Sequence, residues 1–320
     1  MCKEETVKRV QRHIIISYTL NSLWSLKSFY ITLSTMIYFN SRFKKYFMMP
    51  YVNNEIYYEV YGEGRPLMLI HGAWASHEWW RMQIPEFSKK YKVIAIDVRG
   101  HGKSARLEKP TTVQKLAEDV DKVLNTLGIS EIVLVGWSMG GMLSTQYYFE
   151  HPEKVKGLVL ISSRLHKRPR MLIEAYLRTI REMFTLFMDF ADFEGFESLK
   201  YEDEVKKEVQ KMFSSSTDPE IIRWAIEDLT KNRRRDYINI VKTLAKYDAS
   251  DKLHMIKVPM LIIVGDKDER TPPEFAKKIH EKVPHSKLII IEGYGHYMLI
   301  ERPDIVNKEI IDFLQSIGYR

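Results

Sequence analysis

The stretch LVGWSMGGM, residues 134–142, places one polar residue, Ser138, between glycines where an apolar run gives way to a helical pattern. The β-branched run before it is typical of a buried strand, and a helix is predicted from Met139 onward. A strand that turns into a helix without a loop needs a strained residue with small neighbours, and Gly136 and Gly140 meet that need. This G-x-S-x-G pattern is a nucleophile elbow, which exposes the serine oxygen beside the first N–H groups of the helix. The stretch therefore predicts Ser138 as a nucleophile if the rest of the chain supplies its partners.

Composition indicates a globular protein. The 320 residues are 45% hydrophobic and 28% charged, enough for one large core or two modest ones. Cys2 is the single cysteine, which excludes an intrachain disulfide and a cysteine-based metal site. We therefore expect a cytoplasmic protein, because nothing in the composition requires an oxidising compartment.

The formal net charge of +7 is unevenly distributed along the chain. Residues 1–50 hold eight basic and two acidic side chains, a balance of +6, which leaves +1 for residues 51–320. A nearly neutral body argues against nucleic-acid binding. The basic run at residues 231–235 is interpreted as a solvated helix end.

Residues 1–48 differ from the rest of the chain, since they contain no glycine and no alanine. Two apolar runs, residues 14–26 and 29–39, are together long enough to span a bilayer of about 30 Å. Lys27 lies between them, however, and a lysine at mid-span costs about 3 kcal/mol. Three interpretations stay open: a membrane anchor, an amphipathic surface helix, or an upstream extension that is not translated. We favour the last because Met49 leads directly into a plausible first strand, and we expect membrane contact only if residues 1–48 are made.

Short apolar runs alternate with helical patterns through the rest of the chain. A hairpin is predicted over residues 51–61, and further strands at residues 67–70, 93–98, 132–135, 158–161, 260–264 and 288–291. Alternating strands and helices predict an α/β fold, with a mostly parallel central sheet covered by helices on both faces. Functional residues gather at the carboxyl ends of the strands in such sheets.

One interval, residues 164–257, breaks the alternation. It contains no convincing strand and several helical patterns, some of them rich in Met, Phe, Tyr and Leu, at residues 171–187, 204–213, 219–229 and 237–247. We predict a helical lid inserted after the sixth strand, so that residues 49–163 and 258–320 form the core. We call residues 164–257 the inserted segment. Most of its large apolar residues are expected to pack, and a minority to line a substrate pocket.

A serine hydroxyl becomes a nucleophile when a base takes its proton and a carboxylate orients that base. His296 follows the final strand on a glycine-containing loop, and Asp268 follows the strand before it. The order Ser138, Asp268, His296 is the one expected for an elbow of this type. Asp266 is the alternative acid, with a bracing role in the turn as its other interpretation.

Acyl transfer also needs hydrogen-bond donors for the developing oxyanion. The N–H of Met139 lies at the start of a helix, and the N–H of Ala73 lies in the loop after the strand at residues 67–70. Gly72 allows the backbone of that loop to approach closely. His71 is interpreted as a structural residue that bonds within the loop.

Five motifs in this order resemble the α/β-hydrolase fold superfamily: His71-Gly72, Asp97 to Ser104, Gly136 to Gly140, Gly265 to Asp268 and Gly295-His296. The sequence is most similar to the serine branch, with its carboxylesterases, 3-oxoadipate enol-lactonases and cofactor-free haloperoxidases. The resemblance covers residues 50–318 and implies a Ser138, Asp268 and His296 triad with an Ala73 and Met139 oxyanion hole. It also implies a structural turn at Asp97 to Ser104. Dehalogenases and epoxide hydrolases of this fold use an aspartate where this chain has serine, so their chemistry is not expected.

We predict a serine hydrolase that cleaves a small to medium, largely apolar carboxylic ester. Trp74 and Trp137 are expected to line a dry substrate pocket, whereas Trp79 and Trp80 are assigned to the core. A small-molecule ester is the expected partner, and no cofactor or metal is expected.

Two alternatives stay open. The same triad could act on an enol-lactone, on a C–C bond beside a ketone, or as a perhydrolase or haloperoxidase. In a different class of function, the fold could serve a signalling receptor that binds a small molecule and whose triad is weakly active.

Overall fold

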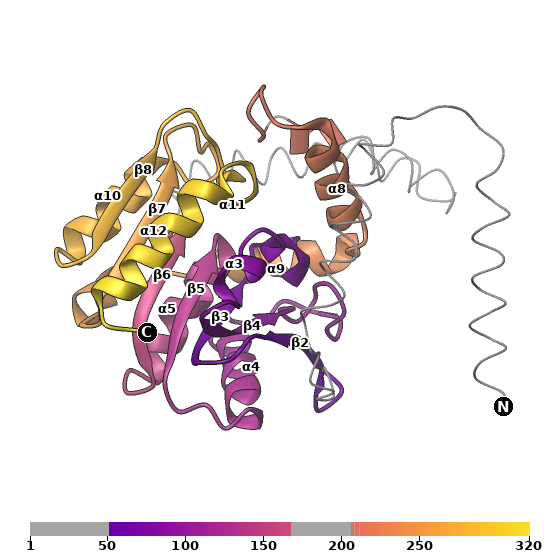
Figure 1. Cartoon of the computed structure of the whole chain (residues 1–320). Helices are drawn as coiled ribbons and strands as arrows, with labels where there is room; N and C mark the ends of the chain where they lie inside the picture. Colours follow the sequence, from indigo (N-terminus) through magenta and orange to yellow (C-terminus); the bar gives the residue numbers. More distant parts are fainter. Residues whose placement is uncertain (1–50, 168–205, 208, 211) are drawn as a thin grey trace, which may run out of the picture. The chain divides into compact units, whose positions relative to one another are not determined.

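The computed structural model describes residues 51–167, 206–207, 209–210 and 212–320. Eight strands of this part of the chain form one sheet in the order β1-β2-β4-β3-β5-β6-β7-β8 (Figure 1). The strands are β1 (Tyr51–Val52), β2 (Ile56–Tyr61), β3 (Arg65–Ile70), β4 (Tyr91–Ile96), β5 (Ile132–Trp137), β6 (Val155–Ile161), β7 (Met260–Gly265) and β8 (Lys287–Ile291). The predictions for residues 1–48 lie outside the described residues.

Strand direction divides the sheet into two parts. β1 with β2 and β2 with β4 pair antiparallel, and every other neighbouring pair of these eight strands is parallel. Asn53 and Asn54 turn the chain between β1 and β2 with φ of 52° and 57°, and Glu55 N–H closes the turn on the Val52 carbonyl. The predicted hairpin and parallel sheet are confirmed. The parallel arrangement brings the carboxyl ends of β3, β5, β7 and β8 to one edge.

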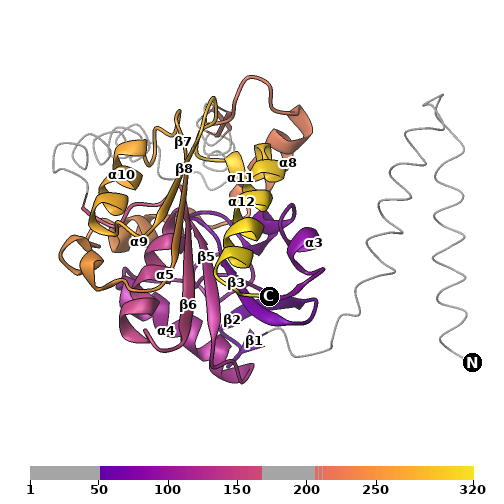
Figure 2. The same ribbon diagram turned by 60° about the vertical axis from the view of Figure 1, so that its left-hand side comes forward.

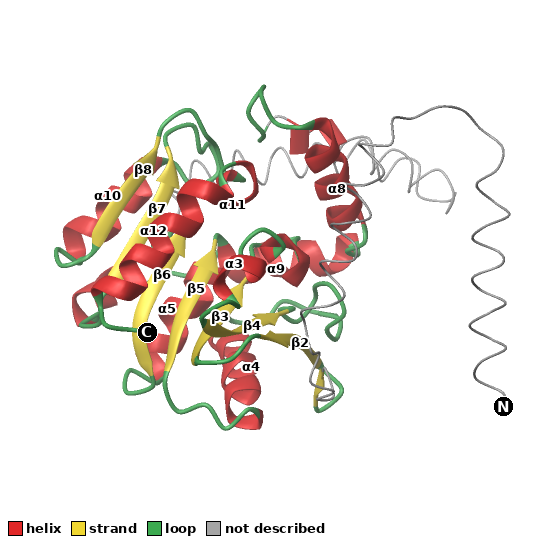
Figure 3. Cartoon of the chain, in the orientation of Figure 1, coloured by secondary structure: helices red, strands yellow, loops and turns green. Residues whose placement is uncertain are grey.

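Helices cover both faces of the sheet (Figures 2 and 3). They are α3 (Ile84–Phe87), α4 (Val113–Thr126), α5 (Met139–Glu150), α8 (Pro219–Thr230), α9 (Arg234–Leu244), α10 (Pro273–Lys282), α11 (Met298–Glu301) and α12 (Pro303–Ser316), with 3₁₀ turns η1 (His77–Trp80) and η2 (Ser250–Met255). α4, α5 and α10 lie on one face, and α3, α11 and α12 lie on the other. This is the predicted three-layer α/β architecture.

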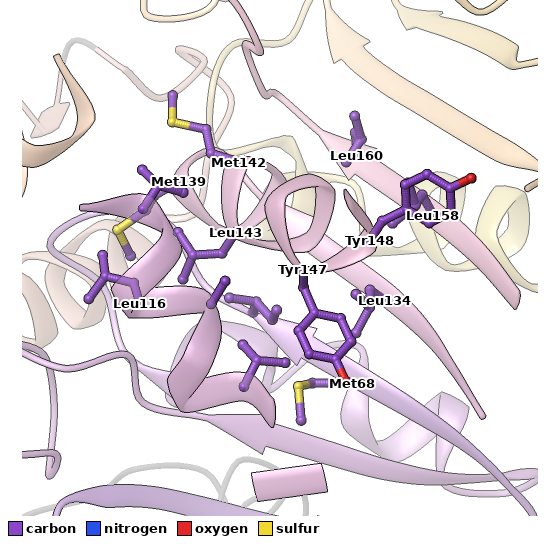
Figure 4. Close-up of a cluster of buried hydrophobic side chains, with 14 of the residues drawn as sticks. Met68, Leu116, Leu134, Met139, Met142, Leu143, Tyr147, Tyr148, Leu158 and Leu160 are labelled. Atoms are coloured by element: carbon purple, nitrogen blue, oxygen red, sulfur yellow. The ribbon is translucent and has the colours of Figure 1, made fainter. Parts of the chain in front are cut away.

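The alternation of side chains along β5 explains why its sequence is apolar throughout. Leu134 packs with the helices of one face, and Val133 and Val135 pack with those of the other. Figure 4 shows the first cluster, in which Leu143 and Tyr147 of α5 lie among side chains from neighbouring elements. α5 is therefore fixed inside the core, and so is the turn that starts it.

Between β6 and β7 the described residues contain α8, α9 and η2 and no strand. The helix predicted at residues 219–229 is α8. The helix predicted at residues 237–247 is α9, which starts earlier, within the basic run, because Asp236 and Arg233 pair there at 3.0 Å. The predicted helix at residues 171–187 lies outside the described residues. In the described part of the chain, no helix has the length and apolar character to cross a membrane.

Candidate active site

Ser138 joins β5 to α5 with no loop between them. It has φ of 53° and ψ of −110°, between a strand that ends at Trp137 and a helix that begins at Met139. Such a backbone is rare for a residue with a side chain and persists only where its surroundings hold it. The Ser138 N–H donates to the carbonyl of Ile161 in β6 at 2.8 Å. The predicted strained turn is confirmed.

The glycines of the elbow are required by close backbone contacts. A Cβ built at Gly136 would overlap the backbone of Gly140, and a Cβ at Gly140 would overlap the carbonyl oxygen of Ile70. The second contact seats the first turn of α5 against the carboxyl end of β3. The elbow and the loop after β3 are therefore neighbours.

His296 lies between Ser138 and Asp268. Its Nε2 is 3.1 Å from Ser138 Oγ, and its Nδ1 is 3.0 Å and 2.9 Å from the two carboxylate oxygens of Asp268. An ionised carboxylate only accepts hydrogen bonds, so Nδ1 carries the proton and Nε2 accepts from the serine hydroxyl. His296 and Asp268 are buried, whereas Ser138 is half-buried. The structure thus places these three predicted residues in the geometry of an activated nucleophile.

Asp268 is held by donors other than His296. The N–H groups of Arg270 and Thr271 donate to Oδ1 at 3.0 Å and 2.8 Å, and the Thr271 hydroxyl donates to Oδ2 at 2.7 Å. Burial raises the pKa of this carboxyl, but the electrostatic interaction and hydrogen bonds with His296, together with the hydrogen bonds from Thr271, outweigh burial and lower the pKa of Asp268 below its usual value. Sequence reasoning missed Thr271, for which the signal is a hydroxyl residue three positions after an aspartate in a turn.

Asp266 has a different environment. Its Oδ1 accepts from the N–H of Gly293 at 2.6 Å, its carboxylate pairs with Lys267, and its own N–H donates to the Ile291 carbonyl. These contacts tie the turn after β7 to the turn after β8. Asp266 therefore has the bracing position that was its second interpretation.

The predicted oxyanion donors lie on the two neighbouring turns. Met139 is the first residue of α5, and Ala73 lies in the loop after β3. Neither N–H donates to an acceptor within the described residues. Unpaired amides at this edge of the sheet suit a site where negative charge develops during reaction. The pairing of these two amides into one oxyanion hole stays a prediction.

A family model described as the alpha/beta hydrolase fold matches residues 65–303. The match contains the elbow, Asp268 and His296. The chain belongs to the α/β-hydrolase fold family.

Relatives by sequence and by structure are hydrolases. The chain is 29% identical over 266 residues to the AB hydrolase superfamily protein YisY of Bacillus subtilis, which covers 82% of this chain and 96% of that protein. It is 27% identical over 280 residues to the bifunctional esterase/perhydrolase DCH of Acinetobacter calcoaceticus, with 82% and 96% covered. A thermophilic esterase from Thermogutta terrifontis shares the fold, with a TM-score of 0.71 at 24% identity over 82% of this chain and 93% of that one. These relatives support an α/β-hydrolase enzyme that acts on ester bonds.

Trp137 of this α/β-hydrolase lies beside the ring of His296. Trp137 is 1% exposed, stacks on Trp79 at 4.8 Å between ring centres, and donates from Nε1 to the His296 carbonyl at 3.1 Å. It thereby supports the loop that carries the base, and its contact with substrate stays a prediction. Trp74 stacks on Tyr237 of α9 at 4.5 Å. Trp79 and Trp80 are fully buried in the core, as predicted.

His71 has the structural role expected of it. Its Nδ1 bonds the Gly72 carbonyl at 2.7 Å, and its Nε2 accepts from the N–H of Val98 at 3.0 Å. Burial lowers the pKa of His71 to about 3, so the ring stays neutral and fixes the β3 loop to the loop after β4.

A second buried histidine and aspartate pair was missed in the sequence. Asp97 Oδ1 accepts from the backbone N–H and from Nδ1 of His77 at 2.7 Å and 2.8 Å, and its Oδ2 accepts from the N–H of Lys103 at 2.9 Å. Asp97 is thus the anchor of a structural turn, as the resemblance implied. Within the described residues, no group of three or more His, Cys, Asp or Glu side chains is placed to hold a metal ion.

Proposed function

We propose that this hydrolase cleaves small to medium, largely apolar carboxylic esters through an acyl-enzyme on Ser138. The observation that carries the proposal is the line of hydrogen bonds from Ser138 through His296 to Asp268, with nitrogen–oxygen distances of 3.1 Å and 2.9 Å. The esterases among the relatives support the same class of bond.

Acylation follows from this geometry. Ser138 Oγ attacks the ester carbonyl carbon as His296 Nε2 takes its proton, and the ionised Asp268 stabilises the imidazolium that results. The N–H groups of Ala73 and Met139 donate to the oxyanion of the tetrahedral intermediate. As the intermediate collapses, the alcohol oxygen leaves with the proton from Nε2, and the acyl group stays on Ser138.

Deacylation repeats the sequence with water. His296 takes a proton from a water molecule, the hydroxide attacks the acyl carbon, and Ser138 Oγ leaves with the proton from Nε2. The carboxylic acid is the second product.

The surroundings of the triad support an apolar substrate. Trp137 and Tyr297 lie within 5.6 Å and 5.9 Å of the His296 ring, and Phe213 packs on Tyr297 at 4.8 Å. An apolar wall favours an uncharged acyl or alcohol group. We propose that the inserted segment, which contributes Phe213, acts as the lid of a core formed by residues 49–163 and 258–320.

The test is hydrolysis of a chain-length series of p-nitrophenyl esters by the full chain and by its Ser138→Ala variant. We expect turnover by the parent and a loss of about 10⁴-fold or more in kcat for the variant, because the nucleophile is removed while the fold is kept. The chain length that gives the highest kcat/KM measures the depth of the pocket. Equal hydrolysis by parent and variant would sink the proposal.

A perhydrolase activity is the second candidate, supported by the name of the DCH relative. Hydrogen peroxide would replace water as the nucleophile that attacks the acyl-enzyme, which releases a peracid and free Ser138. Peracid formed from acetate and peroxide, and lost in Ser138→Ala, would establish it.

Lactone and C–C bond substrates require the same triad. The aligned Ser138 and His296 favour turnover over the receptor alternative, which predicts poor labelling by a fluorophosphonate.

A further inference from the structure

The turn that carries Ala73 has an unfavourable residue at its third position. Gly72 C=O accepts from the N–H of Ala75 at 3.3 Å, so Ala73 and Trp74 are the central residues of a four-residue turn. Trp74 has φ of 71°, in the left-handed region that this turn position reserves for glycine or asparagine. A turn with tryptophan there relaxes unless its surroundings hold it.

Asn232 holds Trp74 from the connection between α8 and α9. Its Nδ2 donates to the Trp74 carbonyl at 2.7 Å, and its Oδ1 accepts from the N–H of Gly102 at 3.1 Å. The side chain is 5% exposed. Both ends of one buried amide are therefore used to join the loop after β3 to the loop after β4, a contact we call the Asn232 bridge. The carbonyl on one side and the N–H on the other fix the orientation of the amide.

The helices on either side of the Asn232 bridge contact the same loop. Tyr237 of α9 stacks on the Trp74 ring with 22° between the ring planes. Asp228 of α8 accepts from the Ser76 hydroxyl at 3.0 Å and from Trp79 Nε1 at 3.0 Å. Side chains of the inserted segment thus contact the residues that follow Ala73 in this loop.

The Asn232 bridge belongs to a buried polar stripe on the inserted segment. The residues of this stripe are three or four positions apart, as on one face of a helix, and each forms a hydrogen bond with a loop of the core. They are Asp228, Asn232, Asp236, Asn239 and Thr243. A stripe at this spacing is usually apolar where a helix packs on a core. Here polar side chains replace it because four of them meet backbone N–H or C=O groups of loops, whereas Asp228 meets the Ser76 hydroxyl and the Trp79 indole N–H.

We propose that Asn232 is a positioning residue for the oxyanion hole, which keeps the Ala73 N–H aimed at the developing charge by holding Trp74 in its strained conformation. The proposal rests on the proposed function of Ser138 and deepens it. The inserted segment then does more than cover a substrate, since it completes the site that stabilises the transition state.

The discriminating variant is Asn232→Asp. A carboxylate keeps an oxygen to accept from the Gly102 N–H, but it has no donor for the Trp74 carbonyl and repels that oxygen. Loss of one oxyanion donor costs about 10²- to 10³-fold in kcat, and a displaced donor costs less. We therefore expect kcat on p-nitrophenyl esters to fall by about 10- to 100-fold while KM stays within about twofold, since the oxyanion exists only in the transition state.

Inhibition by a trifluoromethyl ketone is a measurement that a general loss of stability does not change. The ketone adds to Ser138 Oγ and forms a tetrahedral oxyanion. Its inhibition constant should therefore rise by the same factor by which kcat/KM falls across the variants. Asn232→Ala, which removes both bonds without adding charge, should give the same order of effect. Thermal unfolding of each variant shows whether it is folded.

Thr243→Val is the matched control. It breaks a bond of the same stripe, from the Thr111 N–H to Thr243 Oγ1 at 3.0 Å, away from the Ala73 turn. We expect it to lower thermal stability about as much as the Asn232 variants and to leave kcat within about twofold.

Two failures can be told apart. If the parent hydrolyses esters at Ser138 and Asn232→Asp loses no more kcat than Thr243→Val, or loses kcat without weaker binding of the ketone, this proposal is wrong and the proposed function stands. If the parent neither turns over esters nor is labelled at Ser138 by a fluorophosphonate, both proposals are wrong.

Discussion

Ser138 and Trp74 are two strained residues in neighbouring turns, and the molecule holds them in different ways. Within the part of the chain that the structure describes, Ser138 is held by the core, through the β6 carbonyl and the glycines of the elbow. Trp74 is held by Asn232, which lies 158 residues later in the inserted segment. The strained backbone of Ser138 is held in place once the parallel sheet and α5 have packed together. Strain in the second turn depends on the docking of α8 and α9.

This difference separates two parts of one reaction. Under the proposed mechanism, the nucleophile Ser138 and its base His296 come from the core, whose parts pack against one another on both faces of the sheet. One oxyanion donor, under our proposal, depends on the inserted segment. Mutations in the first part should prevent folding or abolish the chemical step. Mutations in the second part should lower kcat without abolishing it.

The largest effect is expected from Gly140→Ala. The new Cβ would overlap the Ile70 carbonyl oxygen, which belongs to the central sheet and cannot move away without parting β3 from α5. We expect a loss of more than about 4 kcal/mol in the free energy of unfolding, measured by urea denaturation, and little soluble protein.

Gly157→Ala is the control for that substitution. Its Cβ would meet the end of the Ile317 side chain at 3.2 Å, which can shift. We expect a change of less than about 1 kcal/mol. A Gly140→Ala variant as stable as Gly157→Ala would show that the elbow is not rigidly held by the core.

Asp268→Asn should have the next largest effect. The amide cannot stabilise the His296 imidazolium and favours the wrong tautomer of the ring, so kcat should fall by about 10³- to 10⁴-fold with the fold intact. Asp266→Asn keeps an oxygen for the Gly293 N–H and should retain kcat within about threefold. The reverse order of the two kcat values, measured on one ester, would move the acid of the triad to Asp266.

The smallest effect concerns pH and the loop after β4, to which the Asn232 bridge is attached. Burial lowers the pKa of His77, but its hydrogen bonds with Asp97 and Glu78 and the charges of Asp97 and Glu59 outweigh burial. They raise the pKa to about 9, from 6.5 in the unfolded chain. Protonated His77 therefore stabilises the fold fully below pH 6.5, and this stabilisation is lost as pH rises through 9.

The free energy of unfolding should accordingly fall by about 1–3 kcal/mol between pH 6.5 and 9.5 in the parent, and this fall should be smaller in His77→Gln. His285→Gln changes an exposed histidine and should leave the slope of the parent unchanged. If His77→Gln keeps the parental slope, the His77 and Asp97 pair does not hold the loop in the proposed way.

The fold, the elbow and the positions of Asp268 and His296 could be predicted from sequence because each depends on local signals. Apolar runs mark the strands, glycines flank Ser138, and both triad partners directly follow strands whose carboxyl ends meet at one edge. Asp268 could be preferred to Asp266, but only the structure shows that one faces His296 and the other Gly293.

Other parts of the site carry no local signal. Asn232 and Trp74 are distant in sequence, and nothing near either residue indicates the other. His77 pairs with Asp97 across two loops that meet only after the sheet forms. The start of α9 was placed too late because charged residues interrupt the apolar period, whereas Arg233 pairs with Glu108 and Asp236 at that point.

The position of the inserted segment has an evolutionary consequence. β6 and β7 pair directly, so the sheet is complete without the chain that runs between them, and that chain is free to vary among descendants of one ancestor. The Asn232 bridge limits this freedom. Under our proposal, a lineage that replaced this insertion would also have to supply another way to hold Trp74, so the insertion and the turnover rate would change together.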